Sequence, residues 1–178
     1  MYHTIVIGGG CLGAATAISL QKKLHKINKK EKVCLIEKSV LCAAESSRHS
    51  GIVRAANADN DASIMASLST KYWTNLKEVW GVNMETEKFG AIWIAKNNQD
   101  GENPIWEQLS ERMKKIDLVF ERIDKKSTTE KCSDTLITSD NEAYYYEPAA
   151  LQIDPSILRS TIYNALEESG VEVMEKTE

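Results

Sequence analysis

Three glycines near the start of the chain have a spacing that suits the binding of a diphosphate. They follow the apolar residues 4–7 (T-I-V-I) and form the pattern G-x-G-x-x-G. The glycines of this pattern are Gly8, Gly10 and Gly13. The first permits a sharp turn, the second lets the backbone approach a diphosphate, and the third lets a helix pack closely on the strand. A helix that begins near Cys11 would direct its unpaired N–H groups and its positive dipole end at that anion.

An acidic residue follows the second apolar run of the chain. We expect residues 12–27 to form a helix, whose small residues let it lie close to a sheet, and residues 33–36 to form a buried strand that ends at Glu37. An acid at this place can accept hydrogen bonds from the hydroxyl pair of a ribose. The basic linker 28–32 explains why Glu37 lies somewhat beyond the usual distance of about 20 residues. The order of strand, glycines, helix, strand and acid favours a dinucleotide site over a glycine-rich turn with a surface glutamate.

Composition and charge set limits on the class of protein. The 178 residues suffice for one domain, or for most of one with an insertion. A net charge of −4 gives no electrostatic reason to expect nucleic acid. Residues 4–20 carry no charge, but four glycines interrupt them, no basic segment precedes them, and they are shorter than a membrane span. We therefore expect no membrane span and a cytoplasmic location.

The cysteines and histidines show no spacing typical of a metal site. No two of the four cysteines form a C-x-x-C pair, and the three histidines have no partner at ligand spacing. The sequence predicts no metal site and free thiols in a reducing compartment. The helix N-terminus could lower the pKa of Cys11, although an inert small residue in the turn is the favoured interpretation.

The rest of the chain alternates between helical and extended patterns. Residues 155–169 are expected to form a helix that Asp154 caps and Gly170 ends, and residues 171–174 a strand that returns to the parallel sheet. The other expected helices are 59–80, ended by Gly81, a helix that begins at Asn103-Pro104, and a polar turn at 127–133, and the other expected strands are 89–95, 118–120 and 142–147. The predicted fold class is α/β, with a Rossmann-like parallel sheet and an inserted α+β segment. The predicted domains are 1–80 for the first part of the nucleotide-binding domain, 81–150 for the insertion and 151–178 for the return to the sheet.

Residues 45–54, E-S-S-R-H-S-G-I-V-R, complete a combination of motifs that is typical of one family. With the glycine pattern, the L-I-E-K that ends the second strand and the closing Y-Y-Y-E-P…I-D-P-S-I-L…G-V-E-V, the chain resembles the FAD-dependent oxidoreductases related to D-amino-acid oxidase, sarcosine oxidase and dimethylglycine dehydrogenase. Members of this family continue for about as long again. The resemblance therefore implies the N-terminal portion of such an enzyme, completed by a missing C-terminal half or a second subunit.

The resemblance also implies which residues bind FAD. The diphosphate would lie at Gly8, Gly10, Cys11, Leu12 and Gly13, the adenosine ribose at Glu37, and the adenine near Lys38. Ser46, Ser47 and Arg48 would lie along the phosphates and toward the flavin, and Gly51 and Ile52 would let the backbone approach the flavin ring.

Two residues of the same loop are implied to act at the reaction centre. His49 lies close to where some relatives carry a histidine bonded covalently to the flavin, but only Ser50 separates it from the next glycine, so a non-covalent histidine over the ring is favoured. Arg54 aligns with an arginine that binds the substrate carboxylate in sarcosine-oxidase-like members, a role that suits a bidentate guanidinium. The alternative for Arg54 is an ion pair with Asp59 or Asp61.

The implied function is the oxidation of an amine or an α-hydroxy group next to a carboxylate, by hydride transfer to FAD. The substrate would be a small molecule that bears a carboxylate. An NAD-dependent dehydrogenase is an alternative, because Glu37 suits NAD equally well. A non-catalytic nucleotide-binding fragment or subunit is the other alternative.

Overall fold

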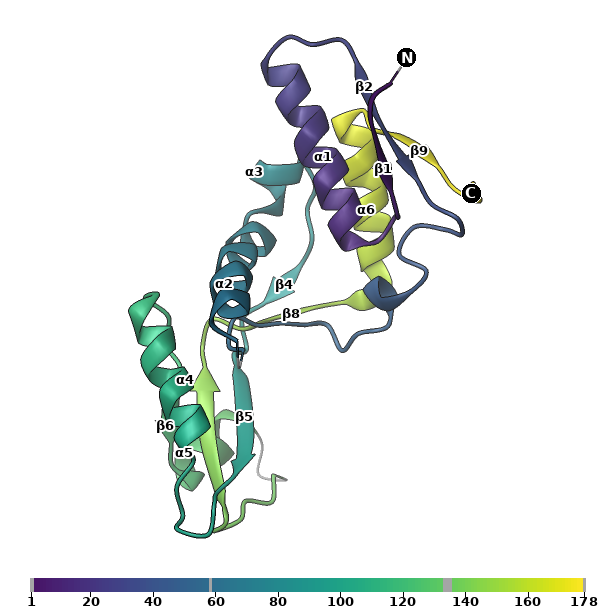
Figure 1. Cartoon of the computed structure of the whole chain (residues 1–178). Coiled ribbons are helices and arrows are strands. Elements are labelled where there is room, and N and C mark those ends of the chain that lie inside the picture. The colour runs from purple at the N-terminus through teal and green to yellow at the C-terminus, as the bar shows by residue number, and fades with distance from the viewer. Residues whose placement is uncertain (1, 58, 133–135, 178) are drawn as a thin grey trace. The chain divides into compact units, whose positions relative to one another are not determined.

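A computed structural model describes residues 2–57, 59–132 and 136–177 of the chain (Figure 1). Contacts within the chain divide it into two compact units. Unit 1 comprises Met1–Gly51, Asn75–Glu85 and Ile153–Glu178, and unit 2 comprises Ile52–Thr74 and Thr86–Gln152. These boundaries differ from the expected ones, because unit 2 already begins at Ile52 and the segment Asn75–Glu85 belongs to unit 1.

The centre of unit 1 is a parallel sheet with the strand order β1-β2-β9. Its strands are β1 (Tyr2–Ile7), β2 (Lys32–Ile36) and β9 (Glu172–Met174). Strand β9 pairs in parallel with β2, so that Leu35 lies opposite Val173. The last strand thus returns to the sheet that β1 begins. This confirms the predicted Rossmann-like α/β class.

Two helices of unit 1 pack against each other and against this sheet, α1 (Cys11–Lys26) and α6 (Pro155–Ser169) (Figure 1). Helix α1 approaches the strands closely because Ala14 and Ala17 are fully buried at its inner face. Helix α6 begins where the carboxylate of Asp154 accepts the N–H of Ser156 at 2.8 Å. It ends at Gly170, whose φ of 78° is left-handed. On β1, the side chains of Ile5 and Ile7 remain 53% and 85% exposed.

The helix predicted over residues 59–80 is wrong in one respect, since the structure contains two helices there. These are α2 (Asn60–Thr74), in unit 2, and α3 (Leu76–Trp80), in unit 1. The backbone of Asn75, with φ −126° and ψ 31°, is not helical. Just before the break, the hydroxyl of Thr74 donates to the carbonyls of Thr70 and Lys71. Gly81 ends α3 with a φ of 86°, as its position predicts.

Unit 2 contains an antiparallel sheet with the order β5-β7-β6. Its strands are β5 (Ala91–Lys96), β6 (Glu121–Ile123) and β7 (Glu142–Glu147), and its further helices are α4 (Pro104–Lys115) and α5 (Lys125–Lys131). A second small sheet orders β3 (Ile52–Val53), β8 (Leu151–Ile153) and β4 (Thr86–Glu87) as β3-β8-β4. Unit 2 therefore combines helices with antiparallel sheets, but it also includes Ile52–Thr74, which lie outside the predicted insertion of residues 81–150.

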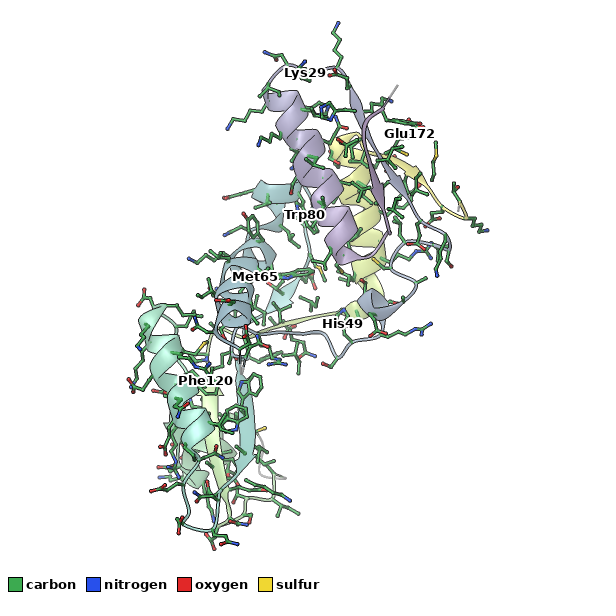
Figure 2. The ribbon with its side chains drawn as sticks, viewed as in Figure 1. Lys29, His49, Met65, Trp80, Phe120 and Glu172 are labelled. Atoms are coloured by element: carbon green, nitrogen blue, oxygen red, sulfur yellow. The ribbon has the colours of Figure 1, made fainter. Side chains whose placement is uncertain are left out.

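Aromatic side chains form the centre of the hydrophobic core of unit 2. The ring of Phe120, which Figure 2 labels, stacks on Tyr145 at 5.3 Å between centroids, and Trp106 stacks on Phe120 at 5.9 Å. Phe120 also explains why the predicted strand at 118–120 is misplaced. A left-handed turn at Asp117 (φ 60°) follows α4, Phe120 enters the core at 1% exposure, and strand pairing begins only at Glu121.

Candidate functional site: the glycine turn and the loop after the second strand

The turn between β1 and α1 has a shape that only glycine permits at two positions. Gly8 has a φ of +104°, a conformation that L side chains rarely adopt. Its N–H donates to the carbonyl of Ile36 at 2.8 Å, which ties the turn to β2. A Cβ on Gly13 would lie 1.9 Å from the carbonyl oxygen of Gly8. The start of α1 therefore packs directly on the end of β1, with no space for a side chain.

The N-terminus of α1 is open to an anion. Gly10 is the N-cap residue and offers no side chain to the helix, and the first turn contains no acidic residue. The first N–H groups of a helix have no partner within it and lie at the positive end of its dipole. The N–H of Cys11 donates to the hydroxyl of Ser46 at 3.0 Å, and the side chain of Leu12 is 87% exposed. This donor set, without a competing carboxylate, fits a diphosphate.

Glu37 lies at the glycine turn, where the sequence places it, and it also binds the turn itself. Its Oε2 accepts the N–H of Gly9 at 2.7 Å, and its Oε1 accepts the N–H of Ser39 at 2.8 Å. The bond from Gly9, followed by that from Ser39, holds the pKa of this carboxyl below its usual range. Each carboxylate oxygen has a second lone-pair position for a further hydrogen bond. Glu37 can therefore hold the turn and still accept a bond from a ribose.

Gly9 contributes to this site but was not singled out from the sequence. A Cβ on Gly9 would lie 2.7 Å from Leu41 and 3.0 Å from the Cβ of Glu37. The run of three consecutive glycines was the signal for the role of Gly9, because the G-x-G pattern itself requires only Gly8 and Gly10.

The loop between β2 and β3 carries the other residues that are predicted to bind FAD, and Ser46 among them contacts the start of α1. Its short helix η1 (Glu45–Ser47) brings Ser46 to the start of α1, where a Cβ on Gly10 would meet the hydroxyl of Ser46 at 3.0 Å. The hydroxyl of Ser47 donates to the carbonyl of Ala44 at 3.2 Å, and the backbone N–H of Arg48 donates to the carbonyl of Glu45 at 3.1 Å, both within the loop. Lys38 is exposed and lowers the pKa of the adjacent Glu37 by its charge.

His49 and Gly51 end this loop within unit 1. The Nδ1 of His49, which Figure 2 labels, accepts the N–H of Gly51 at 2.9 Å. Gly51 has a φ of 78°, and a Cβ there would lie 2.2 Å from the carbonyl oxygen of Ile153. Ile52, the first residue of unit 2, is 54% exposed.

Arg54 lies in unit 2 and is held by an aromatic ring. Its guanidinium carbon is 4.4 Å from the centroid of Trp93, and its Nη1 donates to the carbonyl of Ala56 at 2.7 Å. In the part of the chain that the structure describes, no ion pair joins Arg54 to Asp59 or Asp61. A cavity of about 340 Å³ has Arg54 in its lining, with Ile52, Val53, Asn57, Ala66, Ser69 and Trp73.

A buried glutamate supports the segment that carries Arg54. Glu147 is 1% exposed and accepts the N–H groups of Ala55 at 2.6 Å and Ala56 at 3.2 Å. Its other oxygen accepts the indole N–H of Trp93 at 3.1 Å. Glu147 thus positions both the backbone after Arg54 and the ring beneath the guanidinium. Sequence reasoning missed this role, because the last residue of an apolar strand carries no signal of a partner about ninety residues away.

Metal-ligand clusters and membrane-spanning helices are both missing from the part of the chain that the structure describes. No group of three or more His, Cys, Asp or Glu side chains among them could hold a metal ion. Within the same described ranges, no helix is long and apolar enough to cross a membrane.

The fold and the turn define the chain as a dinucleotide-binding α/β protein with an inserted antiparallel lobe. The model of one family, described as FAD dependent oxidoreductase, matches residues 3–178. This chain belongs to that family, and FAD is the cofactor of the family. The comparison with curated proteins gives no match.

Solved structures share this fold at low sequence identity. L-proline dehydrogenase from P. horikoshii superposes with a TM-score of 0.83 at 21% identity, over 99% of this chain and 44% of its own. L-amino acid deaminase from Proteus vulgaris gives 0.80 at 17% identity, over 99% and 40%. Glycine oxidase from Geobacillus kaustophilus gives 0.78 at 20% identity, over 99% and 47%. The chain thus spans less than half the length of each of these structures.

Proposed function

We propose that this chain forms the FAD-binding turn and part of the substrate side of an oxidoreductase that oxidises an amine or an α-hydroxy group next to a carboxylate. Unit 1 would bind FAD and unit 2 would contribute to the substrate side. The observation that carries the proposal is the open N-terminus of α1 behind Gly8 and Gly13, with Glu37 anchored beside it. Family membership favours FAD over NAD.

The proposed FAD contacts follow from the positions of the donors. The N-cap residue Gly10 and the first turn of α1 (Cys11, Leu12 and Gly13) would hold the diphosphate, with the hydroxyl of Ser46 beside it. Glu37 would accept the ribose hydroxyls, and Lys38 would lie toward the adenine. Ser47, Arg48, His49, Gly51 and Ile52 would extend from the phosphates toward the flavin, which supplies the hydride acceptor.

The proposed role of Arg54 is to bind the substrate carboxylate. Trp93 and the carbonyl of Ala56 occupy one face and one nitrogen of the guanidinium, and the side chain as a whole is exposed and lines a cavity. A guanidinium held in this way has further N–H donors for a bidentate bond to a carboxylate. Relatives in fold include an L-proline dehydrogenase, a glycine oxidase and L-amino acid deaminases. Each of these names an amino acid, which is a carboxylate-bearing amine.

The proposal includes a further part of the enzyme and a cellular location. A second part, on this or another chain, would cover the β1 side of the sheet, where Ile5 and Ile7 are exposed. The support is the span of less than half of the related structures. A reducing compartment such as the cytoplasm suits the four cysteines, which are all free thiols.

The first test is the binding of FAD, measured by the absorbance spectrum of the purified chain before and after acid precipitation. We expect a flavin spectrum, with the flavin released by acid, because a non-covalent His49 is proposed. Leu12→Glu places a negative charge at the exposed start of α1 and should weaken FAD binding about tenfold by repulsion of the diphosphate. Leu12→Gln is the matched neutral control and should bind as the parent does. Binding of ADP without any binding of FAD would favour a non-catalytic nucleotide-binding subunit instead.

The second test addresses the substrate class. Under anaerobic conditions, amino acids, N-methyl amino acids and 2-hydroxy acids are added to the flavin-loaded enzyme, and bleaching of the flavin is recorded. Each acid is paired with its decarboxylated analogue, which we expect to be inactive. Arg54→Met should remove the preference for the acid over its analogue, whereas Arg54→Lys should retain part of it. Equal reduction by both members of each pair would contradict the role of Arg54.

A further inference from the structure

The end of β9 and the residues that follow it run beside the loop that carries Glu37. The N–H of Glu37 donates to the carbonyl of Met174 at 2.9 Å, and the carbonyl of Glu37 accepts the N–H of Thr177 at 3.1 Å. Further along the loop, the carbonyl of Ser39 accepts the N–H of Lys176 at 2.9 Å. Both backbone groups of Glu37 are therefore held by residues at or just after the end of β9.

A side chain of the same segment holds the far part of this loop. The Oε1 of Glu175 accepts the backbone N–H of Leu41 at 2.6 Å. Leu41 is fully buried, so water cannot take the place of this acceptor. The same oxygen lies 3.6 Å from the Nη2 of Arg159 on α6, whose side chain is 51% exposed. An ion pair this open to solvent contributes little, so the bond to Leu41 is the main contact of the carboxylate.

Leu41 in turn packs against the glycine turn. A Cβ on Gly9 would lie 2.7 Å from the side chain of Leu41. The next residue adds a backbone bond, because the N–H of Cys42 donates to the carbonyl of Gly9 at 2.9 Å. The N–H of Gly9 donates to the carboxylate of Glu37 at 2.7 Å. The contact of Glu175 with Leu41 is thus connected to the carboxylate of Glu37 through Gly9.

We propose that Glu175 is a positioning residue of the nucleotide site. Its carboxylate holds the N–H of Leu41, fixes the loop 37–42 against the glycine turn and keeps the carboxylate of Glu37 where a ribose can reach it. Without this acceptor a buried N–H has no partner, and the loop has to shift to find one. The effect on the nucleotide rests on the proposed function, whereas the support of the loop by Glu175 does not.

The test measures the preference of the chain for a ribose hydroxyl. ADP and 2′-deoxy-ADP differ by one ribose hydroxyl, and calorimetric titration gives the affinity of the 178-residue chain for each. A bond from this hydroxyl to the carboxylate of Glu37 should make ADP bind about tenfold more tightly in the parent. A merely structural role of Glu175 would leave this ratio unchanged in a folded variant, whereas displacement of Glu37 lowers it.

Three variants separate the hydrogen bond from the ion pair. Glu175→Met keeps an unbranched side chain but removes the acceptor, and it should lower the ratio to about threefold or less. Glu175→Gln keeps an oxygen that can accept the N–H of Leu41 and should restore the ratio of the parent. Arg159→Met removes the ion pair alone and is the matched control, which should also keep the ratio of the parent.

Circular dichroism verifies that each variant is folded. If Glu175→Met does not fold, Glu175→Asp takes its place, because its shorter side chain draws the acceptor away from Leu41 and should give an intermediate ratio. The ratio of the parent in folded Glu175→Met, or in Glu175→Asp where that variant replaces it, would overturn the proposal.

Hydrogen exchange of the ligand-free chain tests the support of the loop directly. Residues 37–42 should exchange faster in Glu175→Met than in the parent, with no change in the β5-β7-β6 sheet of unit 2. If this exchange is faster but the parent binds neither ADP nor FAD, the proposed function fails and the support by Glu175 stands. If the parent binds FAD and neither the exchange nor the ratio changes in Glu175→Met, the role of Glu175 fails and the proposed function stands.

Discussion

The close approach of Gly13 to Gly8 gives the sharpest prediction for a single residue. Gly13→Ala places a Cβ 1.9 Å from a backbone oxygen, so the turn or α1 must shift. We expect the free energy of unfolding to fall by about 1–3 kcal/mol from this overpacking, partly offset by up to about 1 kcal/mol from the helix propensity of alanine. FAD binding should weaken at the same time. Urea unfolding and flavin titration measure the two effects.

Gly101→Ala serves as the control for this variant. Gly101 has a φ of +78°, but a Cβ there would meet nothing within 4 Å. Alanine should cost about 1–2 kcal/mol of backbone strain and leave the affinity for FAD unchanged, because Gly101 belongs to unit 2. Equal losses of FAD affinity in both variants would show that general destabilisation explains the effect of Gly13→Ala.

Glu37 gives a prediction about pH. The bonds from Gly9 and Ser39 hold the pKa of its carboxyl below the usual range in the folded state. A carboxyl with a lowered folded pKa stabilises the fold above its unfolded pKa of about 4.3, and this contribution is lost as the pH falls through the folded pKa. We expect Glu37→Gln to lower the free energy of unfolding by about 1 kcal/mol at pH 7, because the site is partly open to solvent.

The difference in the free energy of unfolding between the parent and Glu37→Gln should shrink as the pH falls below about 4.3. Urea unfolding at several pH values between 7 and 3 measures it, with Glu121→Gln on β6 as a control for the loss of one exposed carboxylate. A constant difference over the whole range would contradict the assigned hydrogen bonds.

At the residue scale, the sequence predicted the turn and the place of Glu37 because the order of strand, glycines, helix, strand and acid is a recognisable pattern. The first two strands pair in parallel directly around the turn, so the end of β2 has to lie near Gly8. Glu147 escaped prediction because no sequence pattern records its contact. Its partner Ala55 lies 92 residues away.

At the scale of elements, Glu147 joins β7, β5 and the segment after β3. Three N–H groups point at its carboxylate, from Ala55, Ala56 and the indole of Trp93. Glu147→Gln replaces one acceptor oxygen by an NH₂ group that faces a donor. We expect a loss of about 2–4 kcal/mol, since the group is buried and its hydrogen bonds involve a charge.

Tryptophan fluorescence and urea unfolding measure the effect of Glu147→Gln. Because Glu147 also positions the ring beneath Arg54, the variant should reduce the preference for carboxylate-bearing substrates, as Arg54→Met does. Glu121→Gln, at an exposed position on the neighbouring β6, is the matched control. It should change neither the free energy of unfolding nor the preference for carboxylate-bearing substrates. Unchanged stability of Glu147→Gln would show that the carboxylate does not organise this part of unit 2.

The sequence located helices and strands correctly where cap residues and a clear periodicity mark them. The cap at Asp154 and the end at Gly170 located α6 closely, because both residues act on the adjacent helix. The break at Asn75 and the late start of β6 were missed. The apolar pattern continues across the first, and the second follows from the burial of Phe120 in a core that includes Ala55, Ala143 and Tyr145, which are distant in sequence.

At the scale of the whole molecule, the path of the chain is less regular than the sequence indicated. Unit 1 is assembled from three segments, and the short segment Asn75–Glu85 interrupts unit 2. Within unit 1 this segment contributes α3, which packs on α6, and Lys22 of α1 bonds the carbonyl of Val79 at 2.5 Å. The apolar pattern of residues 59–80 continues through the break, so it could not reveal that its last turn belongs to another unit.

This division predicts where FAD should change the protection of backbone amides. Hydrogen exchange followed by mass spectrometry, with and without FAD, should show slower exchange at residues 8–13 and 37–51 of unit 1. The β5-β7-β6 sheet of unit 2 should show little change, because its bonds form independently of the glycine turn. ADP, which carries the diphosphate and ribose without the flavin, should protect residues 8–13 and Glu37 but not His49 or Gly51. Protection by ADP that extends equally to His49 would mean that this end of the loop responds to the phosphates, which would remove the reason to place it beside the flavin.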